Sequence, residues 1–134
     1  MVKHFDHVTI VVRDVEAAKA LSVVISGPKF AGYMGVEGIE AEHVTLVLAN
    51  ASPRQEVQLL KYHRPDPLSD PHRDRLDRLG FNHICFAVDD IEAMVATLRT
   101  HGIRMRNEIM DFHQRKLVFI AGPEDITVEL SEWR

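Results

Sequence analysis

Two histidines recur at the same place in two copies of one sequence pattern, and an imidazole nitrogen is a common metal ligand. Segment 5–17 reads FDHVTIVVRDVEA and segment 81–93 reads FNHICFAVDDIEA, so that His7 and His83 are 76 positions apart. An aspartate, a glutamate and an alanine further along keep the same spacing without a gap. Such a repeat indicates two copies of one supersecondary module. We therefore treat the two histidines as the centre of a candidate site.

A second pair of polar residues lies in the last expected strand of each copy. QEVQLLKY at 55–62 and ITVEL at 126–130 align so that Gln58 corresponds to Glu129. Glu56 is the alternative to Gln58, because side chains two positions apart in a strand share a face. Two imidazoles, a carboxylate and an amide oxygen suit Zn, Mn, Fe, Co or Ni as a divalent cation. If the two modules bring equivalent side chains together, the predicted metal ligands are His7, Gln58, His83 and Glu129.

The elements that must position these residues read, in each copy, as a strand, a helix and three further strands. β-Branched and apolar runs predict strands over 7–12, 30–34, 43–49 and 55–62, and again over 82–88, 104–110, 117–121 and 126–130. We expect the first of these strands to be buried on both faces. Asp14 and Asp90 are expected to cap the two helices, which Gly27 and Gly102 end. The apolar face of the second helix is predicted to contain Ile91, Met94, Val95 and Leu98.

The length of 134 residues fits a single domain. Module one is expected at about 1–62, a linker at about 63–80 and module two at about 81–134. In the linker, Asp70 is expected to cap a short helix that stops at Gly80. The linker contains three arginines, Arg73, Arg75 and Arg78. We interpret them as part of a solvated helix face. The alternative is that one of them, or Arg64, contacts an anionic substrate.

Composition excludes several classes of partner. The net charge of −4 and the pI near 6.0 argue against a nucleic-acid ligand. No apolar run approaches the roughly 20 residues of a membrane span. The single cysteine, Cys85, cannot form an internal disulfide. We expect a cytoplasmic protein that binds a small molecule.

The two openings DHV and NHI, together with the closing strands VQLL and VELS, resemble the vicinal oxygen chelate superfamily of glyoxalases, epimerases, fosfomycin-resistance proteins, bleomycin-binding proteins and extradiol dioxygenases. This resemblance covers nearly the whole chain. It implies an α+β fold of two tandem βαβββ modules that form a curved, cup-shaped mixed sheet. It also implies a divalent metal held by residues matching the four predicted ligands, in an order similar to that of the epimerase branch.

The resemblance further implies a reaction class. Its members use the metal to bind oxygens of the substrate and stabilise an oxyanion, so that a nearby side chain can remove a proton beside a carbonyl. Glu129 and Glu42 match positions that act as catalytic bases in relatives, and Glu40 is an alternative to Glu42. The first helix departs from the family, since LSVVISGP replaces its usual aromatic pair. The resemblance therefore implies a metal-dependent lyase, isomerase or epimerase.

Three other functions remain open within the resemblance: a metal-free binding protein of the bleomycin-sequestering type, a fosfomycin-type transferase and an extradiol-type dioxygenase. The chain has one tryptophan, whereas the drug-binding cups are typically aromatic. Two modules rather than four argue against the dioxygenase. The open sheet edges predict a homodimer, and the resemblance implies one as well, since relatives form homodimers. Modules in such a dimer pair either within a chain or between chains.

Overall fold

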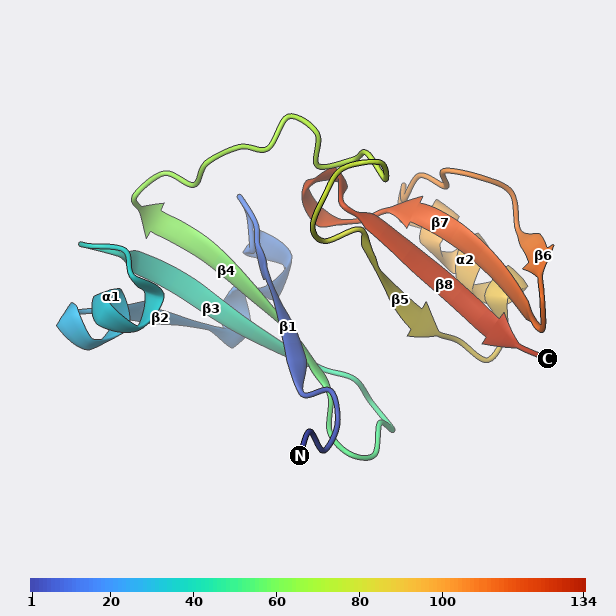
Figure 1. Ribbon diagram of the computed structural model, residues 1–134, viewed down its shortest axis with the longest axis horizontal. Helices are drawn as coiled ribbons and strands as arrows, with labels where there is room; N and C mark the ends of the chain where they lie inside the picture. The colour runs from blue at the N-terminus through green and yellow to red at the C-terminus, as the bar shows by residue number, and fades with distance from the viewer. The chain divides into compact units, whose positions relative to one another are not determined.

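The computed structural model describes the whole chain, residues 1–134, and the chain divides into two units. Unit 1 covers Met1–Ser69 and unit 2 covers Asp70–Arg134. Each unit contains one four-stranded mixed sheet (Figure 1). The α+β class and the pair of mixed sheets are confirmed.

In unit 1 the strand order is β1-β4-β3-β2, and β1 runs parallel to β4 while the other neighbours are antiparallel. The elements of this unit are β1 His7–Val11, the 3-10 helix η1 Glu16–Leu21, β2 Ser22–Ser26, α1 Pro28–Met34, β3 Glu40–Val47 and β4 Glu56–Arg64. One face of β1 is exposed and the other is half-buried, so the expectation that both faces are buried was wrong.

The segment after β1 differs from its prediction. The long helix expected between Asp14 and Gly27 is only η1, because the β-branched run of β2 prefers an extended strand. Pro28 then opens α1 at its first position instead of ending a helix, and Gly35 closes α1 with a φ of 68°. Residues 30–34 are therefore helical and not a strand.

Unit 2 repeats the strand arrangement, with the order β5-β8-β7-β6 and β5 parallel to β8. Its elements are β5 His83–Ala87, α2 Ile91–Thr100, β6 Met110–Phe112, β7 Arg115–Ala121, the 3-10 helix η2 Pro123–Asp125 and β8 Thr127–Trp133. The strand expected over 104–110 is reduced to an isolated bridge between Met105 and Ile120, and β6 begins where that prediction ended.

Helix α2 follows its prediction closely. The Asp90 carboxylate accepts a hydrogen bond from the Ala93 N–H, which is an N-cap interaction. Ile91 and Val95 are buried and pack with Val118 of β7, so α2 covers one face of the second sheet. Met94 is exposed, contrary to its predicted place on the apolar face.

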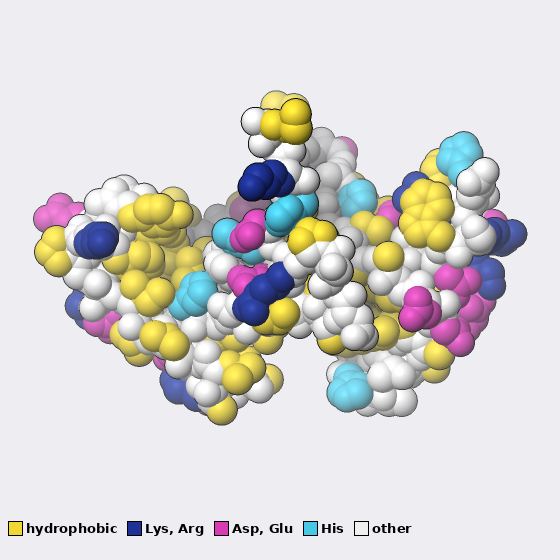
Figure 2. Space-filling model, turned by 90° about the horizontal axis from the view of Figure 1, so that it is seen from below, with side chains coloured by type: hydrophobic (Ala, Val, Ile, Leu, Met, Phe, Trp, Pro, Cys, Tyr) yellow, Lys and Arg dark blue, Asp and Glu magenta, His cyan; other side chains and the backbone are white.

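The prediction of a linker helix was also wrong, since residues 70–80 form only turns and bends. Arg75 pairs with Asp77, and Arg78 lies 3.8 Å from Asp70, so local ion pairs replace the expected helical face. Large apolar side chains remain exposed in both units, among them Val23, Val24 and Trp133. The yellow areas of Figure 2 show such exposed apolar groups between the charged ones.

Candidate metal centre

The two repeated histidines begin equivalent strands and have equivalent neighbours. The Nδ1 atom of His7 lies 2.6 Å from Oδ2 of Asp6, and that of His83 lies 2.6 Å from Oδ1 of Asn82. The Asn82 amide nitrogen donates to the Leu76 carbonyl, which turns its oxygen toward the histidine. In both cases an oxygen is placed to accept from Nδ1–H, so Nε2 is the ring nitrogen left for another partner.

Such a partner on the second ring nitrogen is the usual support of a metal-bound histidine. The hydrogen bond with His7 lowers the pKa of Asp6, which keeps this carboxylate ionised as an acceptor. Sequence reasoning missed both Asp6 and Asn82. The signal was nevertheless present, because each directly precedes its histidine and the pair keeps the repeat spacing of 76.

In unit 2 the structure brings two predicted ligands together. Nε2 of His83 lies 3.7 Å from Oε1 of Glu129. This distance is too long for a hydrogen bond. Glu129 is buried, with 8% of its surface exposed, and a buried carboxylate is costly without a cationic partner. The imidazole nitrogen and the carboxylate oxygen therefore fit a divalent cation.

The other polar groups around Glu129 are two hydroxyls and a thiol, none of which carries a positive charge. The hydroxyls of Thr127 and Ser131 are buried on the same face of β8 and have no hydrogen-bond partner. Cys85 lies opposite Glu129 on β5. Desolvation of the thiol and the neighbouring Glu129 carboxylate raise the pKa of Cys85 to about 12, although the residue as a whole is exposed. Without a cation beside it, the Cys85 thiol is therefore protonated at neutral pH.

In unit 1 the register supports the predicted repeat equivalence. Gln58 lies opposite Thr9, two positions after His7, just as Glu129 lies opposite Cys85, two positions after His83. The register thus confirms that Gln58 corresponds to Glu129. The alternative ligand, Glu56, lies directly opposite His7, so it also belongs to this neighbourhood.

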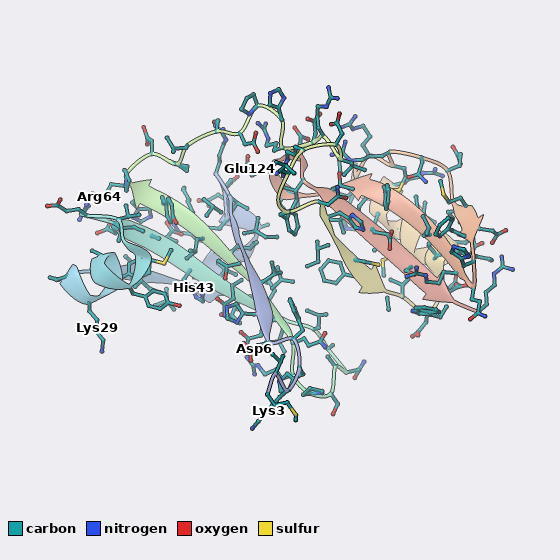
Figure 3. All side chains as sticks on the ribbon, in the orientation of Figure 1. Lys3, Asp6, Lys29, His43, Arg64 and Glu124 are labelled. Atoms are coloured by element: carbon teal, nitrogen blue, oxygen red, sulfur yellow. The ribbon has the colours of Figure 1, made fainter.

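The side chain of Gln58 is the centre of a polar cluster. Its Oε1 accepts from Thr9 Oγ1 at 3.3 Å and lies 3.2 Å from His43 Nε2, which is shown on the sheet of unit 1 in Figure 3. Its Nε2 donates to Glu56 Oε1 at 3.1 Å, and Arg54 donates to the other oxygen of Glu56. These hydrogen bonds lower the pKa of Glu56, which stays ionised. The cluster offers both an amide and a carboxylate oxygen as ligand.

Glu42, a predicted base, lies on the other face of this sheet. His43 contacts Gln58, and successive side chains of a strand point to opposite faces. Glu42 is 3% exposed, accepts from Lys19 of η1 at 2.8 Å and lies 2.7 Å from His63 Nε2. The hydrogen bonds from Lys19 and His63 lower its pKa to about 2. This position gives Glu42 a structural role and leaves it away from Gln58.

His63 connects Glu42 to the other candidate, Glu40. Its Nδ1 lies 2.9 Å from Glu40 Oε1, while its Nε2 faces Glu42. An ionised carboxylate only accepts hydrogen bonds, so both ring nitrogens must carry a proton. Hydrogen bonds to Glu40 and then Glu42 accordingly raise the pKa of His63. Charged His63 thus links β3 to β4, with Lys19 and Arg64 at the two ends of the network.

We expect this network to make stability depend on pH. The raised pKa of His63 gives stabilisation that is complete below its ordinary value of 6.5 and is lost as pH rises through the folded-state value. The lowered pKa of Glu42 gives stabilisation that is present above 4.5 and is lost as pH falls toward about 2. Thermal unfolding should therefore show that His63→Gln lowers the melting temperature more at about pH 6 than at about pH 9.

The matched control for this change is His72→Gln, at an exposed position of the chain segment 70–80. It should leave the melting temperature unchanged at both pH values, because its ring nitrogens contact no carboxylate. An equal effect of His63→Gln at the two pH values would show that the neutral ring stabilises the fold as well as the charged one.

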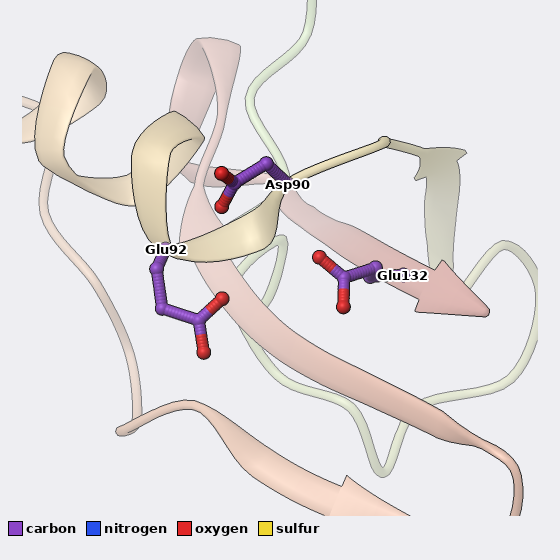
Figure 4. Close-up of side chains that lie close together, drawn as sticks. All are labelled: Asp90, Glu92 and Glu132. Carbon is purple, nitrogen blue, oxygen red and sulfur yellow. The ribbon is translucent and has the colours of Figure 1, made fainter. Parts of the chain in front are cut away.

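A separate cluster of three carboxylates lies at the start of α2 (Figure 4) and consists of Asp90, Glu92 and Glu132. Its members already have partners in the protein. Asp90 caps the helix, Glu132 accepts from the Ile91 N–H at 3.0 Å, and Glu92 pairs with Lys116 at 2.9 Å. Helix capping and an ion pair explain this cluster without a cation.

The two sheets have the same strand order, and the first strand of each begins with a histidine whose Nδ1 is hydrogen-bonded. The protein is therefore a duplicated α+β protein whose histidine, carboxylate and amide side chains are of the kinds that bind metals. The chain belongs to the glyoxalase/bleomycin resistance protein/dioxygenase superfamily, whose sequence profile matches residues 6–119. None of its helices is long and apolar enough to cross a bilayer.

Individual proteins of known sequence or structure are similar to the chain. The chain is 33% identical to glyoxalase I from Saccharomyces cerevisiae over 61 residues, which cover 46% of this chain and only 17% of that protein. It is 27% identical over 131 residues to the uncharacterized protein YaeR from Escherichia coli, covering 97% of this chain and 96% of that protein. A glyoxalase family protein from Bacillus cereus superposes with a TM-score of 0.85 at 23% identity, covering 99% of this chain and 95% of that one.

Proposed function

We propose that this protein is a metal-dependent lyase or isomerase that enolises a small carbonyl substrate. The observation that carries the proposal is the repeated pair of histidines. Each has an oxygen acceptor at Nδ1, and in each unit the residue two positions after the histidine pairs with Gln58 or Glu129 on the neighbouring strand. A purely structural role for the histidines would not require the same arrangement in both units. Membership of the superfamily supports the same class of reaction.

In this proposal each unit supplies a pair of ligands for a divalent cation: His7 with Gln58, or with Glu56 as the alternative, in unit 1, and His83 with Glu129 in unit 2. When bound, the cation supplies Lewis-acid stabilisation of negative charge on a substrate oxygen. The metal could be Zn, Ni, Co, Mn or Fe, since all of them accept imidazole and oxygen ligands.

The chain's own residues supply the rest of the mechanism. Asp6 and Asn82 hold the protons of the two imidazoles on Nδ1 and so fix the tautomer and the ring orientation. Glu129 is the proposed base: its carboxylate accepts the proton from the carbon beside the carbonyl, and the electron pair of that C–H bond moves toward the carbonyl oxygen. Glu42 is not part of this machinery, because its carboxylate is engaged by Lys19 and His63.

Metal titration combined with a proton-exchange assay tests the proposal. The metal-free protein is titrated with Zn²⁺, Mn²⁺, Co²⁺ and Ni²⁺ in separate experiments, and exchange of the C-3 protons of 2-oxooctanoate is followed by NMR in D₂O. We expect at least one of these cations to bind and to raise the exchange rate above that of the metal alone.

Two outcomes would contradict the proposal. Failure of all four cations to bind would leave a metal-free binding protein as the better interpretation. Binding of a cation without faster exchange would remove the enolisation chemistry while leaving a metal site.

A further inference from the structure

The face of the second sheet that carries Glu129 continues toward a cationic and aromatic end. Cross-strand partners share a face. Glu129 lies opposite Phe119, Ser131 opposite Leu117, and Trp133 opposite Arg115. Trp133 lies four positions after Glu129 on β8, which is about 13 Å along a strand. The row therefore joins the candidate metal end to Arg115 and Trp133.

Arg115 is an unpaired cation at that end. Its guanidinium carbon lies 4.7 Å from the centroid of the Trp133 ring, and the residue is half-buried. Its neighbours in the same hairpin are paired, Lys116 with Glu92 and Arg134 with Asp111, whereas Arg115 has no carboxylate within 4.0 Å. A cation–π contact orients the guanidinium without neutralising it. The five donors of this group remain suited to an anion.

The arginines that the sequence suggested as contacts for an anionic substrate are paired with carboxylates. Arg64 pairs with Glu40, Arg73 with Asp125, Arg75 with Asp77 and Arg78 with Asp70. The expectation that one of these contacts an anionic substrate is therefore not supported by the structure. Arg115 has the free charge that these residues lack.

The stretch between the two ends is apolar on its β6 side. Met110 lies opposite Leu117, and Phe112 lies opposite Arg115. Met110 and Phe112 are both exposed, whereas Leu117 is buried. An apolar chain lying between the carbonyl end and the cation would cover these side chains.

We infer that this face binds a carbonyl substrate whose apolar chain carries an anionic group, such as a carboxylate, at its far end. The anion pairs with Arg115, and the chain packs against Trp133 and Met110. This inference rests on the proposed function, because it places the carbonyl at the end of the sheet that holds His83 and Glu129. It adds the class of substrate to that function.

Trp133 is the only tryptophan of the chain, so its fluorescence reports directly on a ligand at this end. We would titrate the protein with 2-oxosuberate and with 2-oxooctanoate, which has the same chain length without the far carboxylate. Both titrations are made with Zn²⁺ and again with a chelator. A charge-assisted hydrogen-bond pair should make 2-oxosuberate bind about 10- to 100-fold more tightly.

Variants of Arg115 then identify the source of that preference. Arg115→Gln should remove the preference for 2-oxosuberate without weakening 2-oxooctanoate, and Arg115→Lys should keep part of it because the charge remains. The matched control is Arg99→Gln on the exposed side of α2, which covers the other face of the sheet. This control should keep the full preference.

Three results would overturn the inference: equal affinity for the two probes, a preference that survives Arg115→Gln, and no saturable change of fluorescence with 2-oxosuberate. Failure of the proposed function gives a different pattern. In that case no cation binds or C-3 exchange is absent, while the fluorescence preference and its dependence on Arg115 persist.

Discussion

Replacing His83 with alanine is expected to lower the affinity for the divalent cation by at least about 100-fold. Loss of a residue that merely supports a metal ligand costs about 10- to 100-fold, so loss of the ligand itself should cost more. The change leaves Glu129 buried with no partner nitrogen within reach. Equilibrium dialysis followed by elemental analysis measures the affinity and the number of cations per chain.

Two further variants make this result specific. His7→Ala changes the equivalent histidine of unit 1 and should also lower the affinity for the cation. His72→Ala, at an exposed position, should bind the cation as the wild type does. Wild-type affinity in His83→Ala would show that the repeated histidines are not the metal ligands.

The equivalence of the two sites could be predicted because it depends on duplication and on strand alternation. Both histidines fall at the start of the strands expected from β-branched runs, and β4 and β8 follow at the expected place. Repeat spacing alone selected Gln58, and the register gives the same correspondence. Local sequence determines these features, so they can be read without tertiary information.

The segment Ser22–Ser26 shows why other parts could not be predicted in this way. Val15, Ala18, Leu21 and Ile25 have helical spacing, yet β2 forms because its β-branched residues pair with β3. Sheet pairing is a tertiary interaction that the spacing does not contain. Pro28 is equally ambiguous, since proline follows a helix as readily as it opens one.

Arg115 could not be found from the repeat. Its register equivalent in unit 1 is Ala41, and Tyr62 takes the place of Trp133. Duplication therefore marks what the two modules share and gives no signal for what only one of them has. Glu42 shows a different limit, because it was selected by resemblance, which does not say on which face of the sheet a side chain lies. Strand alternation places Glu42 on the face away from His43 and Gln58.

The largest effect on catalysis is expected from Glu129→Gln. This change keeps an oxygen ligand of the kind that Gln58 offers, but an amide cannot accept the proton from carbon. General-base catalysis typically contributes about 10²- to 10⁴-fold, so the metal-dependent exchange at C-3 of 2-oxooctanoate should fall by that factor. NMR in D₂O measures this rate, and dialysis measures the cation that is retained.

The comparison with Glu129→Asp and Glu108→Gln separates the role of base from a role in folding. Glu129→Asp keeps a carboxylate and should recover part of the exchange, whereas Glu129→Gln should not. Glu108 is exposed, and Glu108→Gln should exchange at the wild-type rate. If Glu129→Gln retains its cation and still exchanges as fast as the wild type, the proton must leave through another group, and the pairing of Glu129 with His83 would serve metal binding alone.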